Sequence, residues 1–426
     1  MIDIQRIRDD AHGVAELLAT RKLQVDFSRV LELDRSRREA ITRLEALRNE
    51  LKTASKEFPL LKKQGGDVEK LTESMKLTKN EIADLERTAD NHEGELETLM
   101  LGLPNLPLPE VPVGADESDN RVVRVWGERP SYSFTPLSHD ELGEKLGIMS
   151  SEIGVKLAKT RFTLLRKTGA KLERALMNFM LDHLEKRGYE EILPPFMVNS
   201  KALTGTGQLP KFAGDLFAIR DEDLYMVPTA EVPLTNIDAG QVIRGLERGK
   251  PLRYTAYSPC FRSEAGSYGK DTKGYIRQHQ FNKVEMVKIL HPADNQAEFE
   301  ALTADAEAVL QKLGLHYRVV ELCTGDLGFS SARTHDLEVW LPSQQTFREI
   351  SSCSCFTDFQ ARRASIRYKD PETGKNAFAF TQNGSCLAIG RTLVAILENY
   401  QTADGDVIIP EILRPYMGGR TSLRPS

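Results

Sequence analysis

Apolar residues recur at alternating steps of three and four along most of residues 28–100. This heptad spacing places the apolar side chains on one stripe of a helix. Residues 64–67 separate two such stripes. They allow a tight turn because they include Gly65 and Gly66. The pattern predicts an antiparallel coiled-coil hairpin whose arms of roughly 30–35 residues are about 50 Å long. The first stripe contains Val30, Leu33, Arg37, Ala40, Leu44, Leu47, Leu51, Ala54, Phe58 and Leu61, and the second contains Val68, Leu71, Met75, Thr78, Ile82, Leu85, Ala89, His92, Leu96 and Leu99.

After this region the pattern changes to a mixture of helix and strand signals. A cluster of prolines ends the helical repeat and marks a linker, which we place at residues 104–130. The linker separates an N-terminal domain at residues 1–103 from a larger domain at residues 131–426. The prolines are Pro104, Pro107, Pro109 and Pro112.

The larger domain is predicted to be α+β, a sheet with helices packed on it. Amphipathic helices are expected at residues 171–187 and 298–313, because apolar residues recur at helical spacing and a glycine follows each segment. Strands are expected at residues 317–323 and 337–341. Periodicity alone does not give the order of the strands in the sheet.

Residues 253–285 are the most informative segment of this domain. They indicate a β-hairpin with a long loop that contains Gly and Lys residues. We expect its first strand to end at Ser263 and its second to begin at about Tyr275.

Side chains of chemical interest alternate along this hairpin. Because strand side chains alternate between faces, Arg262 shares a face with Glu264 on the first strand. On the second strand, Phe281, Lys283 and Glu285 share a face. If the two faces coincide, one surface carries cations, carboxylates and an aromatic ring, which suits a nucleotide and a small cationic group. A half-exposed hairpin with ordinary surface charge remains the alternative.

The composition is that of an ordinary globular protein, with 40% apolar and 28% charged residues. A net charge of −5 gives no overall basic field, so any contact with RNA must come from local patches. The five cysteines include no C-x-x-C pair, which indicates neither a disulfide framework nor a zinc site. The N-terminus lacks an apolar signal core, and no apolar run approaches the roughly 20 residues of a membrane helix. We therefore expect a reduced, cytoplasmic protein that binds no zinc and no membrane.

Three ordered segments resemble the motifs of a known enzyme family. The letters FRSE at residues 261–264 and QHQFNKVE at residues 278–285 resemble motif 2 of the class II aminoacyl-tRNA synthetases, and of the seryl-tRNA synthetases in particular. Residues 188–195 resemble motif 1, and NGSCLAIGRTLVAILENYQ from Asn383 resembles motif 3. The likeness extends to the N-terminal arm. It implies a class II catalytic domain with a mainly antiparallel sheet flanked by helices.

The resemblance also implies an activity, the ATP-dependent conversion of L-serine to seryl-adenylate and transfer of serine to tRNA(Ser) and tRNA(Sec). In activation the serine carboxylate attacks the α-phosphorus of ATP, so the protein must neutralise charge and hold geometry. The catalytic arginines of the family correspond to Arg262, at the α-phosphate, and Arg391, at the γ-phosphate. The implied ATP-binding residues are Arg262, Ser263, Glu264, Phe281, Glu349, Ile350, Ser351, Ser352 and Arg391.

Arg391 has a second argument, because it follows Gly390 and opens a predicted helix at residues 392–400. A cation at a helix N-terminus opposes the helix dipole by about 0.3–1 kcal/mol, and a bound anion offsets this cost. By resemblance, Glu264 contacts the adenosine and Phe281 stacks on adenine. A solvated Arg391 and plain core packing of Phe281 are the alternatives.

The resemblance places Mg²⁺ on Glu349 and Ser352, which offer the oxygen ligands that this ion prefers. In a regular strand, however, Glu349 would share a face with Ser351. The assignment therefore requires a bulge or a strand end near Ser351. A carboxylate paired with Arg348 or another cation is the alternative.

Serine needs an anchor for its ammonium group and polar partners for its hydroxyl group. Such partners would reject alanine, because alanine would leave them unpaired. Cys386 departs from the family, whose members often have Gly or Ala after Ser385, and we assign it no catalytic role. The implied serine-binding residues are Thr229, Ala230, Glu231, Arg262, Glu285, Asn383 and Ser385.

The two arms of the predicted coiled coil differ in charge. Residues 29–63 contain 10 basic and 6 acidic residues, and residues 67–97 contain 4 basic and 10 acidic residues. Ion pairs between the helices explain much of this difference. The family resemblance implies that the first helix also contacts tRNA phosphates. The implied tRNA-binding residues are Arg35, Arg38, Arg43, Arg48, Lys52 and Lys56.

The sequence therefore favours a homodimeric serine-activating enzyme that uses Mg²⁺ with ATP as co-substrate, since motif 1 builds the dimer interface in the family. Two alternatives remain. One is a related enzyme that loads an amino acid onto a carrier protein, although such enzymes tend to lack the arm. The other is a coiled-coil RNA-binding or scaffold protein with a degenerate catalytic domain.

Overall fold

The computed structural model describes residues 1–65, 67–265 and 274–424. The chain divides into two compact units. The smaller unit contains Ile2–Ala19 and Leu23–Pro104, and the larger contains Met1, Thr20–Lys22 and the chain from Asn105 onward. Across the described ranges, no helix combines the length and the apolar character that crossing a membrane requires.

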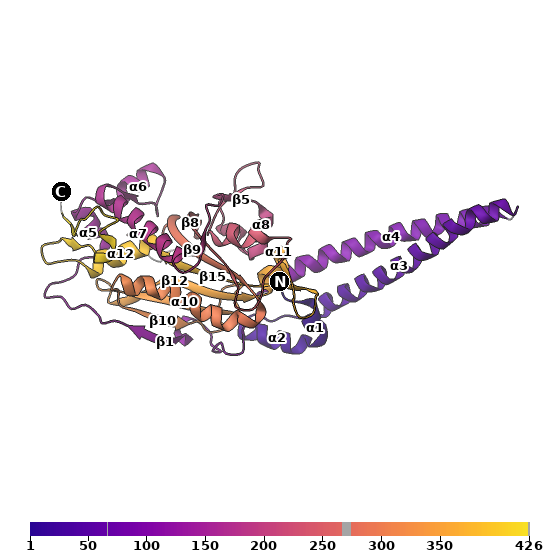
Figure 1. The fold of residues 1–426 in the computed structure, drawn as a ribbon, viewed down its shortest axis with the longest axis horizontal. Helices are drawn as coiled ribbons and strands as arrows, with labels where there is room; N and C mark the ends of the chain where they lie inside the picture. Colours follow the sequence, from indigo (N-terminus) through magenta and orange to yellow (C-terminus); the bar gives the residue numbers. More distant parts are fainter. Residues whose placement is uncertain (66, 266–273, 425–426) are drawn as a thin grey trace. The chain divides into compact units, whose positions relative to one another are not determined.

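The smaller unit is dominated by two long antiparallel helices, α3 and α4, which lie side by side (Figure 1). This arrangement confirms the predicted coiled-coil hairpin. One detail of the predicted stripe is wrong, because Leu99 is 38% exposed whereas Met100 is 3% exposed. The predicted turn includes Gly66, which lies outside the described residues. The helices of this unit are α1 (Ile4–Asp9), α2 (Ala11–Thr20), α3 (Ser28–Lys63) and α4 (Val68–Leu101).

Ion pairs join α3 to α4 along their exposed edges. Arg43 lies 2.9 Å from Glu81, and Arg48 lies 2.7 Å from Glu86. Near the other end of the pair, Arg29 lies 2.8 Å from Glu95. Exposed pairs of this kind contribute little to stability, but they favour one register of the helices over others. The charge difference between the helices is therefore explained in part by interhelical pairing.

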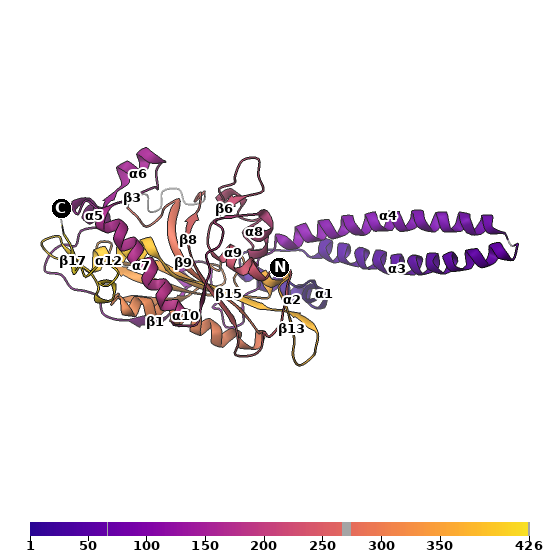
Figure 2. The ribbon, with the colours of Figure 1, turned by 45° about the horizontal axis from the view of Figure 1, so that its top comes forward.

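An eight-stranded sheet forms the centre of the larger unit (Figure 2). Its strand order is β1-β10-β11-β12-β15-β9-β8-β4, and every neighbouring pair is antiparallel except β4 and β8. The predicted mainly antiparallel sheet is confirmed. β1 lies within the predicted linker, after its four prolines. The strands are β1 (Arg121–Trp126), β4 (Glu190–Glu191), β8 (Leu252–Phe261), β9 (Gln280–Leu290), β10 (Tyr317–Glu321), β11 (Arg333–Leu341), β12 (Thr346–Thr357) and β15 (Phe380–Ala388).

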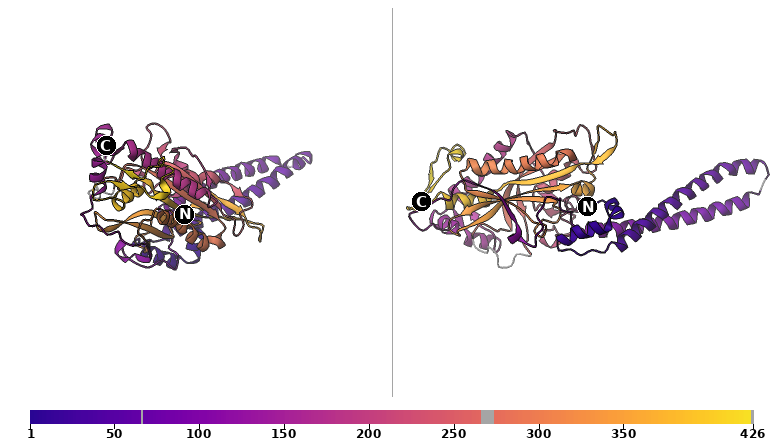
Figure 3. Two further views of the ribbon diagram at one scale, coloured as in Figure 1. Left: turned by 60° about the vertical axis from the view of Figure 1, so that its left-hand side comes forward. Right: turned by 90° about the horizontal axis from the view of Figure 1, so that it is seen from below.

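Three helices cover one face of this sheet and bury the main core: α7 (Lys167–Glu185), α10 (Asn295–Lys312) and α12 (Ile389–Asn399). α10 lies along the sheet (Figure 3). The predicted helices at residues 171–187 and 298–313 are present, but each begins and ends earlier than predicted. One row of apolar residues that α7 buries recurs every four positions: Leu172, Leu176, Met180 and Leu184.

The opposite face of the sheet is covered in one part by the short helices α9 (Glu231–Thr235) and α11 (Phe359–Ala364), and α8 (Ser200–Thr206) packs on both of these helices. The remaining part of this face carries the cavity described below. The other elements are α5 (His139–Lys145), α6 (Ser151–Leu157), β2 (Met149–Ser150), β3 (Leu164–Leu165), β5 (Met197–Val198), β6 (Tyr225–Met226), β7 (Val242–Ile243), β13 (Arg367–Lys369), β14 (Asn376–Phe378), β16 (Val407–Ile408) and β17 (Ser422–Leu423).

The predicted β-hairpin is present as β8 and β9, but its strand ends differ from the prediction. β8 ends at Phe261 rather than Ser263, and β9 begins at Gln280 rather than near Tyr275. Glu264 has a φ of 51°, a left-handed conformation outside any strand. Strand alternation therefore does not place Arg262 and Glu264, although it does place the residues of β9. Residues 266–273 of the predicted loop lie outside the described residues.

Candidate active site

A cavity of about 300 Å³ lies on the face of the sheet opposite α10. Residues from widely separated segments meet in its wall, including the segment after β8, the start of β9, β12, β15 and the start of α12. The structure thereby brings together eleven of the predicted site residues: Thr229, Glu231, Arg262, Glu264, Phe281, Glu349, Ile350, Ser352, Asn383, Ser385 and Arg391.

Arg262 and Phe281 form one wall of this cavity. The Arg262 guanidinium carbon lies 5.2 Å from the centre of the Phe281 ring, within range of a cation–π contact. Arg262 Nε donates to the carbonyl oxygen of Pro228 at 3.3 Å. Within the described residues, Arg262 forms no ion pair. Its charge therefore lies at the cavity wall without a neutralising carboxylate in contact.

Glu264 and Arg277 form an ion pair at the same wall, with 2.7 Å between Arg277 Nη1 and Glu264 Oε2. The sequence analysis did not identify Arg277. Since β9 begins only at Gln280, strand alternation gave no indication of where the Arg277 side chain points. Its place in the cavity depends on the conformation of the irregular segment before β9.

A bulge in β12 brings Glu349 and Ser352 to the same face. β12 pairs with β11 so that Ser351 faces Leu337 and Glu349 faces Glu338, which leaves Ile350 as an extra residue. An extra residue shifts the alternation of side chains by one position. As a result both Glu349 and Ser352 line the cavity. The bulge required by the proposed Mg²⁺ ligands is therefore present.

Arg391 reaches Glu349 across the cavity. Its Nη1 lies 3.4 Å from Glu349 Oε2 and donates to the Glu349 carbonyl oxygen at 2.7 Å. Arg391 is in the first turn of α12, which begins at Ile389, earlier than predicted. The charge of Arg391 holds the pKa of Glu349 below its usual value against the opposing effect of burial, and the charge of Arg262 adds to that lowering. Glu349 is thus an ionised carboxylate between two arginines.

Asp336 lies directly opposite Ser352 on β11. Burial, reinforced by the charge of Glu349, raises the pKa of Asp336 well above its usual value. Its buried Oδ1 has no hydrogen-bond partner among the described residues. Two carboxylates and a hydroxyl group thus offer oxygen donors at this place, and one donor is unsatisfied. In the described part of the chain, no three His, Cys, Asp or Glu side chains are arranged to hold a metal ion.

The polar end of the cavity is built on Glu285, whose side chain is completely buried just behind the wall. Lys283 forms an ion pair with Glu285 and donates to Thr229 Oγ1 at 3.0 Å. Thr229 Oγ1 donates to Glu285 Oε2 at 3.3 Å, and Asn383 Nδ2 donates to Glu285 Oε1 at 2.9 Å. Lys283 was placed beside Phe281 and Glu285 by strand alternation, but it was not identified as a site residue.

Glu231 lies at the same end, 7% exposed. Burial, together with the nearby charge of Glu285, raises the pKa of Glu231 to about 7. Gln360, Lys283 and Arg262 oppose that rise. A ligand that brings a positive charge or a hydrogen-bond donor would therefore favour the ionised form of Glu231.

Besides Glu285, three predicted site residues do not line the cavity. The Ser263 hydroxyl donates to the Gly214 carbonyl oxygen at 2.6 Å, and the Ser351 hydroxyl donates to the Ser385 carbonyl oxygen at 2.6 Å. Ala230 is completely buried. Cys386, also completely buried, is the extra residue where β15 pairs with β9, and it belongs to the main core. Its thiol neither lines nor narrows the cavity.

The wall of the cavity has more cations than carboxylates. Its cations are Arg262, Arg277, Lys283 and Arg391, and its carboxylates are Glu231, Glu264 and Glu349. A cavity with this balance and with an aromatic ring beside an arginine suits a phosphorylated aromatic base. The carboxylates at its polar end suit an ammonium group.

The predicted tRNA-binding residues lie on α3 of the smaller unit. Three of them already form ion pairs, because Arg43 and Arg48 pair with α4 and Arg38 lies 3.1 Å from Asp34. Within the described residues, no ion pair is formed by the other three, which are exposed: Arg35, Lys52 and Lys56.

Comparison with known proteins identifies two families along the chain. Residues 216–400 match the tRNA synthetase class II core domain (G, H, P, S and T), and residues 1–107 match the seryl-tRNA synthetase N-terminal domain. The chain is 54% identical to a serine–tRNA ligase of Geobacter sulfurreducens over 420 residues, which cover 98% of this chain and 99% of that protein.

Solved structures agree with these matches. The crystal structure of seryl-tRNA synthetase from Pyrococcus horikoshii complexed with ATP superposes with a TM-score of 0.92 at 35% identity, covering 100% of both chains. The crystal structure of A. aeolicus tRNASec in complex with M. kandleri SerRS gives a TM-score of 0.58 at 17% identity, covering 80% of this chain and 69% of that one. The second likeness supports the fold alone.

Proposed function

The chain belongs to the seryl-tRNA synthetase family, and from this premise we propose that it activates L-serine with ATP and transfers serine to tRNA(Ser). The observation that carries the proposal is the cavity. Its wall combines four cations with an aromatic ring, and buried carboxylates lie at one end. ATP supplies the anion and the base, and serine supplies the ammonium group.

In this proposal the cations act on the phosphates of ATP. Arg262 neutralises charge that develops on the α-phosphate, and Arg391 holds the γ-phosphate at the start of α12. Phe281 stacks on adenine beside Arg262, while Glu264 contacts the adenosine. The serine carboxylate attacks the α-phosphorus, its bond to phosphorus forms, and pyrophosphate leaves with the bonding electrons. The protein contributes charge and alignment rather than a covalent intermediate.

Glu349 and Ser352 would hold Mg²⁺, which neutralises phosphate charge when bound. The donors fit this ion, because they are oxygens that share one face of the β12 bulge. Asp336 lies opposite Ser352, and its Oδ1 has no hydrogen-bond partner among the described residues. A cation bound there would interact favourably with this oxygen. Since few protein ligands gather at this place, phosphate oxygens and waters would complete the coordination.

Serine is held at the polar end of the cavity in this proposal. Glu231 and Glu285 provide negative charge for the ammonium group, and Thr229, Asn383 and Ser385 provide polar partners. Alanine would lack the hydroxyl group and leave such partners unpaired.

Serine-dependent exchange of pyrophosphate into ATP tests this proposal on the purified full chain. We expect exchange with serine, and little or none with alanine, threonine or glycine. Exchange with another amino acid would keep the enzyme class and overturn the substrate. Absence of exchange with all four, given folded protein and Mg²⁺, would favour the scaffold alternative. Transfer of labelled serine to tRNA then excludes a carrier protein as the sole acceptor.

We also propose a division of labour, with the domain at residues 1–103 binding tRNA through α3 and residues 131–426 carrying out catalysis. The exposed cations Arg35, Lys52 and Lys56 support this, because no carboxylate among the described residues neutralises them. Replacing all three by Gln should weaken tRNA(Ser) binding and flatten its salt dependence. Replacement of Glu69, Glu73 and Asp90 by Gln on α4 is the matched control. Weakening in the control alone would contradict the assignment.

tRNA(Sec) is the second acceptor that we propose, since the same arm and active site would serve both RNAs. Charging of transcripts of both tRNAs by the same preparation tests it. Equal loss of both activities in the three-residue α3 variant is expected. Charging of tRNA(Ser) alone would overturn the second acceptor.

We propose a homodimer in the cytoplasm. Leu193, in the segment that resembles motif 1, is 84% exposed, which is unusual for a large apolar side chain beside Pro194 and Pro195. Sedimentation should therefore give a dimer, and Leu193→Lys should shift the chain toward monomer. A monomer for the unmodified chain would overturn the proposal. Fractionation of cells that express the chain tests the cytoplasmic location.

A further inference from the structure

Gln360 on α11 is completely buried. It does not line the cavity, but it contacts Glu231, which does. Its Nε2 donates to Glu231 Oε1 at 2.7 Å and to the carbonyl oxygen of Thr206 at 3.2 Å. Its Oε1 accepts from the hydroxyl of Thr381 at 2.8 Å. Every hydrogen-bonding hydrogen of this amide is therefore used.

The partners of Gln360 allow one orientation of its side-chain amide. A carbonyl oxygen only accepts, so the group that faces Thr206 must be the NH₂ of the amide. The second hydrogen of that NH₂ then points to Glu231. A flipped amide would place its oxygen against both the Thr206 carbonyl and the Glu231 carboxylate, and it would lose these two hydrogen bonds. The contacts with Thr206 and Thr381 thus fix the Gln360 NH₂ as the donor to Glu231.

Each of those partners is itself held by regular structure. Thr206 is the last residue of α8, and Thr381 is a completely buried residue of β15. α11 packs against both α8 and β15. Gln360 therefore connects the carboxylate of Glu231 to α8, α11 and β15. The residues that make these contacts are not among those predicted to bind ATP.

One oxygen of Glu231 is held by this contact, and the second has no hydrogen-bond partner among the described residues. Burial of Glu231 favours its neutral form, and a hydrogen bond donated by an amide favours the carboxylate. Burial and the charge of Glu285 raise the pKa of Glu231 to about 7, and the bond from Gln360 opposes this rise. Without Gln360, Glu231 would be neutral over more of the physiological pH range and could turn within the cavity.

We propose that Gln360 is a positioning residue for amino-acid recognition, which holds Glu231 as an oriented carboxylate that accepts a hydrogen bond from serine. This inference rests on the proposed activation of serine. The ligand group must be a donor, which is either the ammonium group that all amino acids share or the hydroxyl group of serine. Gln360 acts through Glu231 and does not touch the substrate.

Gln360→Met tests the proposal, because methionine keeps the length and approximate volume of glutamine but donates no hydrogen bond. In serine-dependent pyrophosphate exchange, we expect KM for serine to rise about 10-fold or more while KM for ATP stays within about twofold. Thr381→Val is the matched control. It removes one bond to Gln360 but leaves the donor to Glu231, so its effect on KM for serine should be clearly smaller.

The pH dependence of KM for serine separates positioning from general damage to the fold. Since Glu231 binds as a carboxylate, KM for serine should fall as pH rises through the pKa of Glu231. In Gln360→Met that inflection should move to higher pH, because the carboxylate has lost its donor. A fall in selectivity for serine over alanine would identify the hydroxyl group as the ligand donor, and unchanged selectivity would identify the ammonium group.

Two results would overturn the inference. One is an unchanged KM for serine in folded Gln360→Met, and the other is an equal rise in KM for ATP with no change in the pH profile. Both differ from failure of the proposed function, in which the unmodified chain itself would show no serine-dependent exchange.

Discussion

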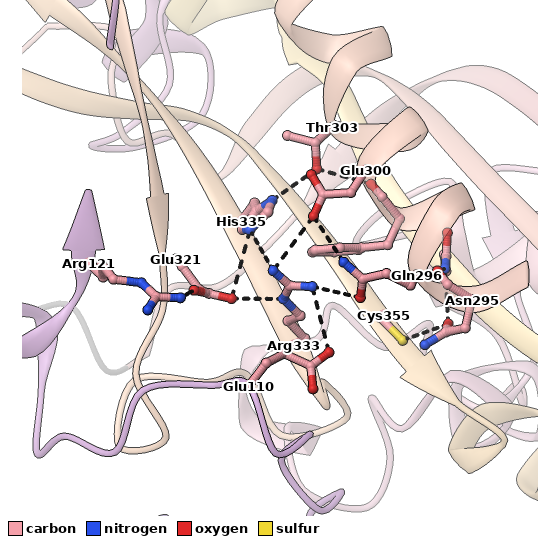
Figure 4. Close-up of polar contacts among 12 residues, drawn as sticks. Glu110, Arg121, Asn295, Gln296, Glu300, Thr303, Glu321, Arg333, His335 and Cys355 are labelled. Carbon is pink, nitrogen blue, oxygen red and sulfur yellow. Dashed lines mark hydrogen bonds and ion pairs between the residues drawn. The ribbon is translucent and has the colours of Figure 1, made fainter. Parts of the chain in front are cut away.

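The two faces of the eight-stranded sheet carry charged clusters that differ in how completely they are paired. On the core face, Arg333 lies 2.8 Å from Glu321 and 3.6 Å from both Glu110 and Glu300 (Figure 4). On the cavity face, Arg262 contacts one carbonyl oxygen and an aromatic ring, and within the described residues it forms no ion pair.

This difference separates a structural cluster from a binding cluster. The core-face cluster has carboxylates around each buried cation, so it is complete without a ligand. In the cavity-face cluster Arg277, Lys283 and Arg391 are paired with carboxylates, but Arg262 has none in contact among the described residues. The charge of Arg262 is compensated when a polyanion enters. Burial and charged side chains alone do not distinguish the two clusters. The presence of one unpaired cation, Arg262, does.

The largest effect should come from removing the unpaired cation. Arg262→Ala should abolish serine-dependent pyrophosphate exchange, with a loss on the order of 10³-fold, because it removes charge stabilisation at the α-phosphate. Stability should change little. Arg129→Ala is a control on the same unit, since Arg129 contacts the Trp340 ring at 4.1 Å away from the cavity. Unchanged exchange in Arg262→Ala would refute the role of Arg262.

Removing the paired cation should have the opposite outcome. Arg333→Met leaves the completely buried Glu321 paired with the exposed Arg121 but without its buried partner, so we expect a loss of up to about 3 kcal/mol in the free energy of unfolding by urea. Exchange by the folded fraction should be retained. The double variant Arg333→Met, Glu321→Leu should recover most of the stability, because neither buried charge then remains. Loss of exchange in fully folded Arg333→Met would contradict a purely structural role for the core-face cluster.

The pH dependence of stability should also differ between the faces. On the cavity face, burial raises the pKa of Glu231 to about 7 from its usual 4.5. Between those values the folded chain keeps a proton that the unfolded chain has released, so the free energy of unfolding falls as pH rises. Glu231→Gln removes this term. Relative to the unmodified chain, it should gain about 1 kcal/mol per pH unit between pH 4.5 and 7.

On the core face the sign is reversed. Burial, aided by the charge of Arg333, lowers the pKa of His335 to about 4 from its usual 6.5. Between those values the unfolded chain binds a proton that the folded chain does not, so stability rises with pH. His335→Asn removes this term and should gain about 1 kcal/mol per pH unit, relative to the unmodified chain, as pH falls from 6.5 to 4. A slope of the same sign for both variants would contradict these assignments.

The coiled coil could be predicted from the sequence almost completely. Its signal repeats every seven residues, and its two helices are neighbours in the chain, so the pattern itself specifies what packs on what. The error lies at one end, where Met100 rather than Leu99 is buried. The buried position at the end of α4 is therefore one residue later than the heptad repeat predicts. The packing of the two helices determines where such an offset occurs.

The candidate site could be predicted in part. Family resemblance indicated Arg262, Phe281, Glu349 and Arg391, and strand alternation indicated that Phe281, Lys283 and Glu285 share a face. Arg277 was missed, because it lies in an irregular segment before β9 where no periodicity applies.

The sequence by itself determined the helical arm, the α+β class of the larger unit and the residue types of the cavity, because those follow from local period and short motifs. Only the tertiary structure decided the strand order, the extra residue Ile350 in β12 and the contact between Gln360 and Glu231, which are 129 positions apart. These features depend on pairing between distant segments. A strand's local pattern is compatible with many partners and registers, and burial of the whole sheet selects one of them.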